Sequence, residues 1–278
     1  MGRTPLFLGI VLVTSLPFAS PARAQERPLY PAPQFAVQGN PTEVELGDVD
    51  ADGALDVVTA NFLQNSVCVA RGVGNGSFAA STVVASACCS PASLALGDFN
   101  GDGFLDAVVG SPQGPGNTSV HLGTGTGTFG AALSASTDGA EAVALADIDL
   151  DGALDLVMGA SATTSLLLGH GDGTFAPPLG LAASGGMLAL ELADVGGDGF
   201  PDIVGLRRNG NSLLVFSGRG GGSFGASSEF VVGSPLMSPL HFALRDLNRD
   251  GAPDAVVGSN GAGLSVATGD ARRGVTGV

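Results

Sequence analysis

Short apolar stretches alternate with glycine-rich or acidic turns along almost the whole chain. Runs such as Leu94–Gly97 and Ser66–Val69 are bounded by turn residues, and the β-branched run Asp56–Thr59 follows an acidic loop. Apolar residues at helical spacing over roughly ten positions are absent. The chain also contains 45 glycines, which are unfavourable inside helices. The pattern therefore predicts an all-β protein built from short strands.

One acidic loop, Asp-x-Asp-x-Asp-Gly-x-x-Asp, recurs along the chain with limited variation at its third position. Its copies lie 47 to 52 residues apart and start at Asp48, Asp98, Asp147, Asp194 and Asp246. An apolar stretch precedes each loop and a second one follows it. A third stretch then ends in a glycine-rich turn such as Gly72–Phe78, and a fourth leads to the next loop. Each repeat is therefore predicted to contain four strands.

Repeats of this size and strand number are typical of β-propeller blades, which pack face to face around an axis. We predict one propeller domain over residues 25–278, with five blades closed by the N-terminal strand. The segment Tyr30–Asp48 aligns without gaps with Phe129–Asp147, so it supplies an outer strand with no blade before it. The last repeat stops after its third strand, Leu264–Thr268. The alternative is a truncated larger ring, because the tail Asp270–Val278 lacks the glycine-rich turn that ends in Phe.

The loop pattern is suited to Ca²⁺, which takes six to eight oxygen ligands at about 2.3–2.6 Å. Positions one, three, five and nine supply side-chain oxygens, position seven supplies a backbone carbonyl, and the glycine at position six permits the tight bend. Without a cation, such a group of carboxylates would be unfavourable, because each close pair costs about 4 kcal/mol at an effective dielectric near 20. The predicted ligands are Asp48, Asp50, Asp52, Ala54 and Asp56; Asp98, Asn100, Asp102, Phe104 and Asp106; Asp147, Asp149, Asp151, Ala153 and Asp155; Asp194, Asp198, Phe200 and Asp202; and Asp246, Asn248, Asp250, Ala252 and Asp254.

The five predicted calcium sites differ in their third position. Gly196 removes one ligand from the Asp194–Asp202 loop, which is therefore expected to be the weakest site. Asn100 and Asn248 keep an oxygen but lower the charge, so the first and third loops are expected to bind most tightly. An EF-hand requires Glu at position twelve and flanking helices, whereas these loops carry no Glu there and are followed by strands.

The N-terminus predicts secretion. Arg3 precedes an apolar run from Leu6 to Leu16, and Ala22-Arg23-Ala24 is a small-x-small cleavage signature, so residues 1–24 are predicted to be a signal peptide cut near Ala24. The mature protein would then be secreted, cell-surface or periplasmic. The formal net charge of −15 argues against a nucleic-acid partner and against docking on anionic lipid, and no apolar run is long enough for membrane insertion.

No catalytic set is apparent in the sequence. The three histidines, His121, His170 and His241, have no nucleophile and acid at a recognisable spacing. We therefore predict a binding or adhesion module without catalysis, with an unknown protein or glycan ligand. One alternative is a lectin or carbohydrate-active enzyme that uses the propeller face, although the chain has one Tyr and no Trp. Another is a fragment of a larger surface propeller.

The repeats resemble the FG-GAP/VCBS repeats of integrin α-subunit propellers and many bacterial surface proteins. The resemblance rests on the five acidic loops and their surrounding strands, and it covers Tyr30 to Thr268. It implies a propeller that holds calcium in the hairpin loop between the first two strands of each blade. It also implies a role in ligand binding, because such repeats occur in ligand-binding surface proteins.

Overall fold

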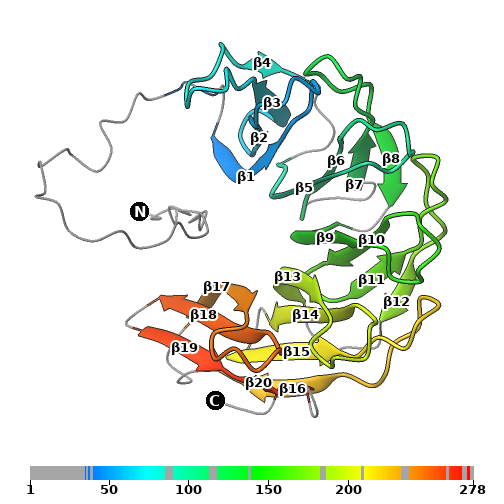
Figure 1. The fold of residues 1–278 in the computed structure, drawn as a ribbon, viewed down its shortest axis with the longest axis vertical. Coiled ribbons are helices and arrows are strands. Elements are labelled where there is room, and N and C mark those ends of the chain that lie inside the picture. The colour runs from blue at the N-terminus through cyan, green and yellow to red at the C-terminus, as the bar shows by residue number, and fades with distance from the viewer. Residues whose placement is uncertain are drawn as a thin grey trace, which may run out of the picture.

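The computed structural model describes the repeat region as a series of small antiparallel sheets (Figure 1). The residues described are 35, 37, 40–84, 90–112, 118–136, 139–181, 186–207, 210–232, 238–260, 263–270 and 274–275. The predicted signal peptide lies outside them. Every regular element in these ranges is a strand, and none of them contains a helix that could cross a membrane. The all-β prediction is confirmed.

Each of the first four repeats forms one four-stranded sheet whose strands are neighbours in chain order, and the fifth forms a three-stranded sheet. The strands of the first two sheets are β1 (Pro41–Gly47), β2 (Asp56–Asn61), β3 (Ser66–Ala70), β4 (Thr82–Val83), β5 (Ser93–Gly97), β6 (Asp106–Gly110), β7 (Thr118–His121) and β8 (Leu133–Ser136). Those of the next two are β9 (Ala142–Ala146), β10 (Asp155–Gly159), β11 (Thr164–Leu167), β12 (Leu179–Leu181), β13 (Met187–Ala193), β14 (Asp202–Arg207), β15 (Ser212–Phe216) and β16 (Ser228–Val231). The last are β17 (Ser238–Arg245), β18 (Asp254–Asn260), β19 (Gly263–Ala267) and the short pair β20 (Gly269–Asp270) and β21 (Gly274–Val275).

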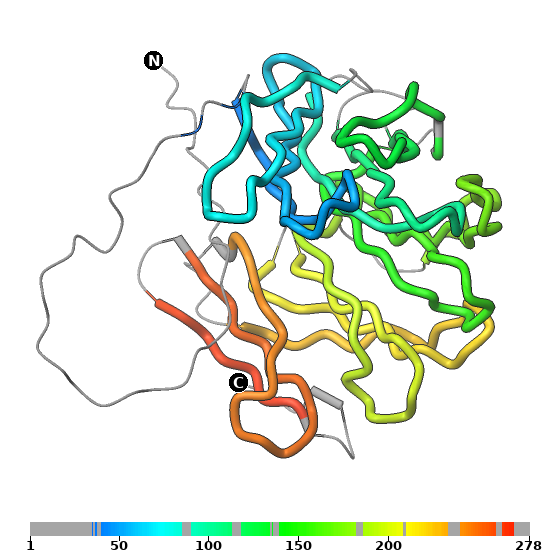
Figure 2. Tube along the Cα trace, turned by 45° about the horizontal axis from the view of Figure 1, so that its top comes forward, coloured from blue at the N-terminus to red at the C-terminus, as the bar shows by residue number. Residues whose placement is uncertain are grey.

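The sheets follow one another around an arc, with the first strand of each sheet on the inside (Figures 1 and 2). These inner strands contact in sequence, β1 with β5, β5 with β9, β9 with β13, and β13 with β17. Each sheet therefore packs its face on the next, as blades of a propeller do. In Figure 1 the arc is open between the sheet of β1 and the sheet of β17.

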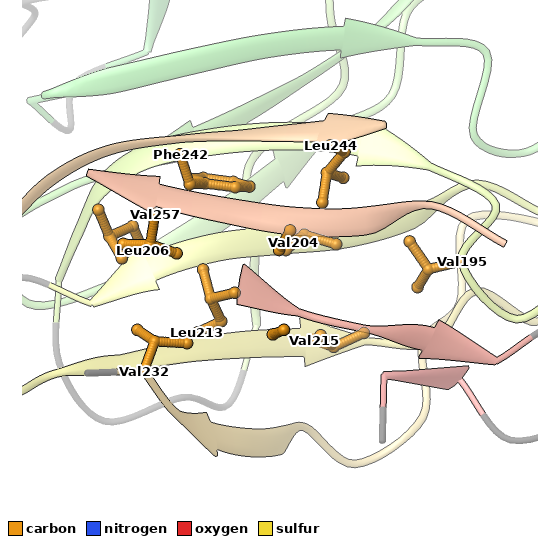
Figure 3. Close-up of a cluster of buried hydrophobic side chains, with 11 residues drawn as sticks. Val195, Val204, Leu206, Leu213, Val215, Val232, Phe242, Leu244 and Val257 are labelled. Atoms are coloured by element: carbon orange, nitrogen blue, oxygen red, sulfur yellow. The ribbon is translucent and has the colours of Figure 1, made fainter. Parts of the chain in front are cut away.

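Apolar side chains fill the spaces between successive sheets. Each of four buried clusters joins two neighbouring sheets. Figure 3 shows the cluster between the fourth and fifth sheets, where Leu206 of β14 and Phe242 of β17 point into one core. Val195, the second residue of the fourth acidic loop, is also buried in this cluster. A fully buried side chain of this kind contributes roughly 1.5–3 kcal/mol, so the acidic loops are anchored to the interfaces between sheets.

The predicted closure by the N-terminal strand is not among the described contacts. Within the described residues, β19 pairs with β18 alone, and β1 is the inner strand of the first sheet. Phe35 lies instead against Phe78 of the first sheet, with ring centroids 5.1 Å apart. Most of Tyr30–Asn40 lies outside the described residues. Closure of a five-blade ring therefore stays a prediction.

The C-terminal tail differs from its expected form. The glycine-rich turns of the first four repeats are each closed by a bridge between the first Gly and the final Phe, as in Gly72 with Phe78 and Gly218 with Phe224. In the fifth repeat Gly269 pairs with Val275 at the same spacing. The absence of the Phe predicted that this turn was lost, but the backbone pairing between β20 and β21 needs no aromatic side chain.

Two glutamates of β1 lie on the face that packs toward the second sheet. Glu43 and Glu45 pair with Ala60 and Val58 of β2, which belong to the core between the first two sheets. Burial raises the pKa of Glu43 to about 7, and repulsion from Glu45 adds to this rise. Burial also raises the pKa of Glu45. The folded protein therefore holds a proton on Glu43 more tightly than the unfolded chain does.

Glu43 is expected to make stability depend on pH. Because its folded pKa lies above the unfolded value of 4.5, its favourable contribution is complete below that value and is lost as pH rises through about 7. Glu43→Gln should therefore raise the free energy of unfolding by about 2 kcal/mol at about pH 8, after allowance for its partial exposure, and change it little at about pH 5. Urea denaturation at both pH values checks this, and an equal effect at both would contradict it.

Candidate metal centre

The five acidic loops occupy equivalent places in the fold. Each connects the inner strand of its sheet to the second strand, as the loop between β1 and β2 does. Because the strands are antiparallel and in chain order, the glycine-rich turns after the third strands lie at the same ends of the sheets. Acidic loops and glycine-rich turns therefore share one face of the arc.

The aspartate at position one organises each loop through two backbone hydrogen bonds. In the first loop Asp48 Oδ1 accepts from the N–H of Asp52 at 3.0 Å, and Asp48 Oδ2 accepts from the N–H of Gly53 at 2.9 Å. The corresponding pairs of bonds recur in the other four loops. Position five accepts from the N–H of position seven in every loop, as Asp151 does from Ala153 at 2.8 Å. The carboxylates are thus held in place by the protein backbone.

The backbone of each loop turns through two left-handed residues. Position six is always Gly, with φ between 87° and 95°. Position four is Gly in two loops, but in the other three it is Ala51, Leu150 and Arg249, with φ of 57°, 65° and 64°. A left-handed conformation costs a non-glycine residue roughly 1–2 kcal/mol. Three loops keep the same shape despite this cost, which shows that the surrounding hydrogen bonds determine the conformation.

The aspartate at position nine is buried and joins two turns. Asp155 has no exposed surface; its Oδ2 accepts from the N–H of Ile148 at 2.8 Å and its Oδ1 from the N–H of Gly169 at 2.8 Å. Ile148 belongs to the acidic loop and Gly169 begins the glycine-rich turn. The same arrangement recurs at the other four position-nine aspartates, Asp56, Asp106, Asp202 and Asp254. This residue therefore ties the acidic loop to the turn beside it.

Burial shifts the pKa values of three position-nine aspartates. Burial raises the pKa of Asp106, Asp155 and Asp202 above the ordinary value, and their backbone hydrogen bonds oppose this rise. The carboxylates of Asp102 and Asp98 raise the pKa of Asp106 further. A cation in the loop would lower these raised pKa values, because it favours the charged form of every nearby carboxylate.

Two loops bring three acidic oxygens close enough to share one ion. Within the described residues, ligand atoms of Asp48, Asp50 and Asp56 lie within 4.8 Å of one another, and so do those of Asp147, Asp149 and Asp151. These are the first and third loops, which the sequence predicts to bind calcium most tightly. A set of carboxylate oxygens on a tight turn fits the ligand preference of Ca²⁺. The residues would hold the ion as a structural cross-link within the loop.

The other loops show how substitutions at position three alter the site. In the second loop Asn100 Nδ2 donates to Asp102 Oδ2 at 2.9 Å, and Asn248 makes the equivalent bond to Asp250 in the fifth. The amide thus engages one oxygen of the position-five carboxylate. In the fourth loop Gly196 has no side chain, and its N–H donates to Asp202 Oδ2 at 3.0 Å. This loop has one oxygen ligand fewer, in line with its expected weakness.

The position-nine aspartates have a structural role that the sequence pattern did not predict, since it marked them only as ligands. Both oxygens of each already accept backbone N–H groups, which leaves the remaining lone pairs for a metal. The signal was present, because a glycine-rich turn follows each loop after two further strands. The first glycine of each turn packs against the carbonyl of position eight in the neighbouring loop, such as Leu154 beside Gly169.

The fold and its loops define a class: a propeller-like repeat protein with one acidic hairpin loop per blade. Comparison with protein families gives four overlapping matches to the FG-GAP-like repeat, at residues 48–109, 98–158, 147–205 and 197–257. The chain belongs to the FG-GAP-like repeat family.

Solved structures resemble the fold at low sequence identity. One is an Agrocybe aegerita lectin that recognises non-reducing terminal N-acetylglucosamine, with a TM-score of 0.62 and 22% identity; the match covers 86% of this chain and 65% of the lectin. Another is BBS1N in complex with ARL6DN, with a TM-score of 0.57 and 11% identity over 87% of this chain and 68% of that one. This chain thus spans less than two thirds of the lectin's length. At these identities the likeness concerns the fold.

Proposed function

We propose that this protein is a secreted binding module, a β-propeller stabilised by calcium in its acidic loops and without catalytic activity. The observation that carries the proposal is the repeated hydrogen-bonded loop, in which backbone N–H groups hold the carboxylates at positions one and five in the same arrangement five times. A site built this way favours an ion that accepts many oxygen ligands. The predicted signal peptide supports secretion.

The face opposite the acidic loops is the proposed ligand-binding face. It carries the connections between second and third strands and those from one sheet to the next. These connections differ in length and sequence, whereas the acidic loops and glycine-rich turns keep theirs. Calcium would order the face that carries the acidic loops and hold the sheets in a fixed arrangement, and the variable connections would then provide specificity.

The proposal includes closure of five blades by the segment from Tyr30, with a truncated larger ring as the alternative.

A glycan or a matrix protein is the proposed type of ligand. The net charge of −15 disfavours nucleic acid and anionic membrane surfaces. Of these two ligand types, a glycan has a specific observation in its favour, because the fold resembles that of a lectin. A binding screen against glycans and matrix proteins, with and without calcium, tests the proposal. Calcium-dependent binding of a glycan or matrix protein would support it, and turnover of a glycan during the same screen would contradict the absence of catalysis.

The loops are expected to differ in their calcium dependence. Asp151→Ala removes a ligand from the complete third loop, whereas Asp198→Ala removes one from the fourth loop, which already lacks a side chain at position three. The first substitution should therefore reduce the calcium-induced rise in melting temperature more than the second. Asp151 and Asp198 each accept one hydrogen bond from the backbone N–H of position seven. The two substitutions should therefore cost similar stability in calcium-free buffer. Equal losses would contradict the ranking of the loops.

A further inference from the structure

Arg71 lies beside a carboxylate of the first acidic loop. Its Nη1 is 3.5 Å from Oδ2 of Asp50, the position-three ligand. The side chain of Asp50 is only 10% exposed, whereas that of Arg71 is 53% exposed. The guanidinium therefore lies against a carboxylate group of the first loop that is largely shielded from solvent.

The second sheet holds Arg71 in this place. A methyl group added at Gly127, in the glycine-rich turn of the second repeat, would lie 2.5 Å from Cδ of Arg71 and 3.5 Å from Cβ of Asp50. Gly127 has a φ of 76°, a left-handed conformation that favours glycine. The turn therefore has no side chain where the arginine stem passes. The stem of the arginine is thus packed between its own acidic loop and the neighbouring sheet, and its position does not depend on the ion pair alone.

The equivalent residues in the next repeats are uncharged. In each repeat the residue before the glycine-rich turn accepts a backbone hydrogen bond across it: Arg71 from Ala79, Leu122 from Gly130, and Leu168 from Ala176. Leu122 and Leu168 also lie under a glycine of the following turn, as Arg71 does. In the fourth repeat Ser217 occupies this position and accepts from Gly225. Among these four repeats, the first therefore carries a cation where the others carry none.

We propose that Arg71 is a resident counter-cation of the first acidic loop, which lowers its calcium affinity relative to the third loop. The inference rests on the proposed calcium function. The guanidinium lies 3.5 Å from Oδ2 of Asp50 and would repel a divalent cation bound a few ångströms away. Calcium must displace it or bind beside it, so the first loop fills at a higher calcium concentration than the third, although both have four aspartates. The first site would then still respond to changes in calcium concentration after the third site is filled.

The test follows the two loops separately in the mature protein labelled with ¹⁵N-glycine. Gly53 and Gly152, at position six of the first and third loops, report on each site by NMR during a calcium titration. In the wild type the Gly152 midpoint should lie about tenfold below that of Gly53, which corresponds to about 1.4 kcal/mol. Arg71→Leu, which introduces the residue found at Leu122 and Leu168 of the neighbouring repeats, should lower the Gly53 midpoint about tenfold and leave the Gly152 midpoint unchanged.

Two further variants separate charge from packing. Arg71→Lys keeps a cation and should leave the Gly53 midpoint close to that of the wild type. Leu168→Arg places a guanidinium at the equivalent position of the third repeat and should raise the Gly152 midpoint about tenfold. An unchanged Gly53 midpoint in Arg71→Leu, with both signals still responding to calcium, would overturn the role of Arg71 alone. Absence of any calcium response at both glycines would refute calcium binding itself and this inference with it.

Discussion

Replacement of Asp155 by alanine is expected to destabilise the protein by about 3 kcal/mol in calcium-free buffer. The substitution leaves the N–H groups of Ile148 and Gly169 without their acceptor in a position with no solvent exposure. Each hydrogen bond to a charged group contributes about 1.5–3 kcal/mol, and a buried donor without a partner costs a similar amount. Urea denaturation in the presence of a chelator measures this effect without any contribution from metal ligation.

Asp172 provides a matched control in the same repeat. Its carboxylate is exposed and accepts from the N–H and hydroxyl of Thr174, two residues away. Asp172→Ala should therefore shift the denaturation midpoint far less than Asp155→Ala. Similar losses from the two substitutions in chelator would show that Asp155 acts only as a metal ligand, and the proposed tie between loop and turn would be wrong.

Gly169→Ala is expected to destabilise the protein by a similar amount, about 3 kcal/mol, through overpacking against the backbone. A Cβ atom at this position would overlap the carbonyl oxygen of Leu154, with the carbonyl carbon 3.1 Å away. The turn cannot move aside without lengthening the 2.8 Å bond from the Gly169 N–H to Asp155. Thermal melting of the variant measures the loss.

Gly180→Ala is the control for the loss of glycine itself. Gly180 lies in β12, the outer strand of the same sheet, and no heavy atom lies within 4 Å of a Cβ added there. Alanine should be tolerated at this position or raise stability slightly, because it restricts the unfolded chain. If Gly169→Ala melted at the same temperature as Gly180→Ala, close packing of loop and turn would not be needed for the fold.

The strand order and the place of the acidic loops could be predicted from the sequence because the repeat supplies the same information five times. A single run such as Ser66–Val69 is ambiguous, but its recurrence before a glycine-rich turn predicts a third strand. The position of each loop between the first two strands followed from the apolar stretches on both sides. The same repetition predicted the weak loop, since Gly196 departs from the other copies.

Features that depend on contacts between repeats could not be predicted in this way. The ion pair between Arg71 and Asp50 joins residues 21 positions apart, and no periodicity marks it. The raised pKa of Glu43 arises from packing against the second sheet, which a strand pattern does not reveal. The turn at Gly269 keeps its backbone pairing without the Phe that marks the other turns. Each of these features depends on how separate parts of the chain come together in the fold, which the sequence pattern does not specify.

Calcium as a structural ligand of the acidic loops is the central claim, and one measurement tests it. The mature protein is melted in calcium, in magnesium, and in chelator at equal ionic strength. Several filled loops, each contributing about 2–3 kcal/mol at saturating ion, should raise the melting temperature by about 10 °C or more in calcium and much less in magnesium. A melting curve that is the same in calcium and in chelator would contradict the claim.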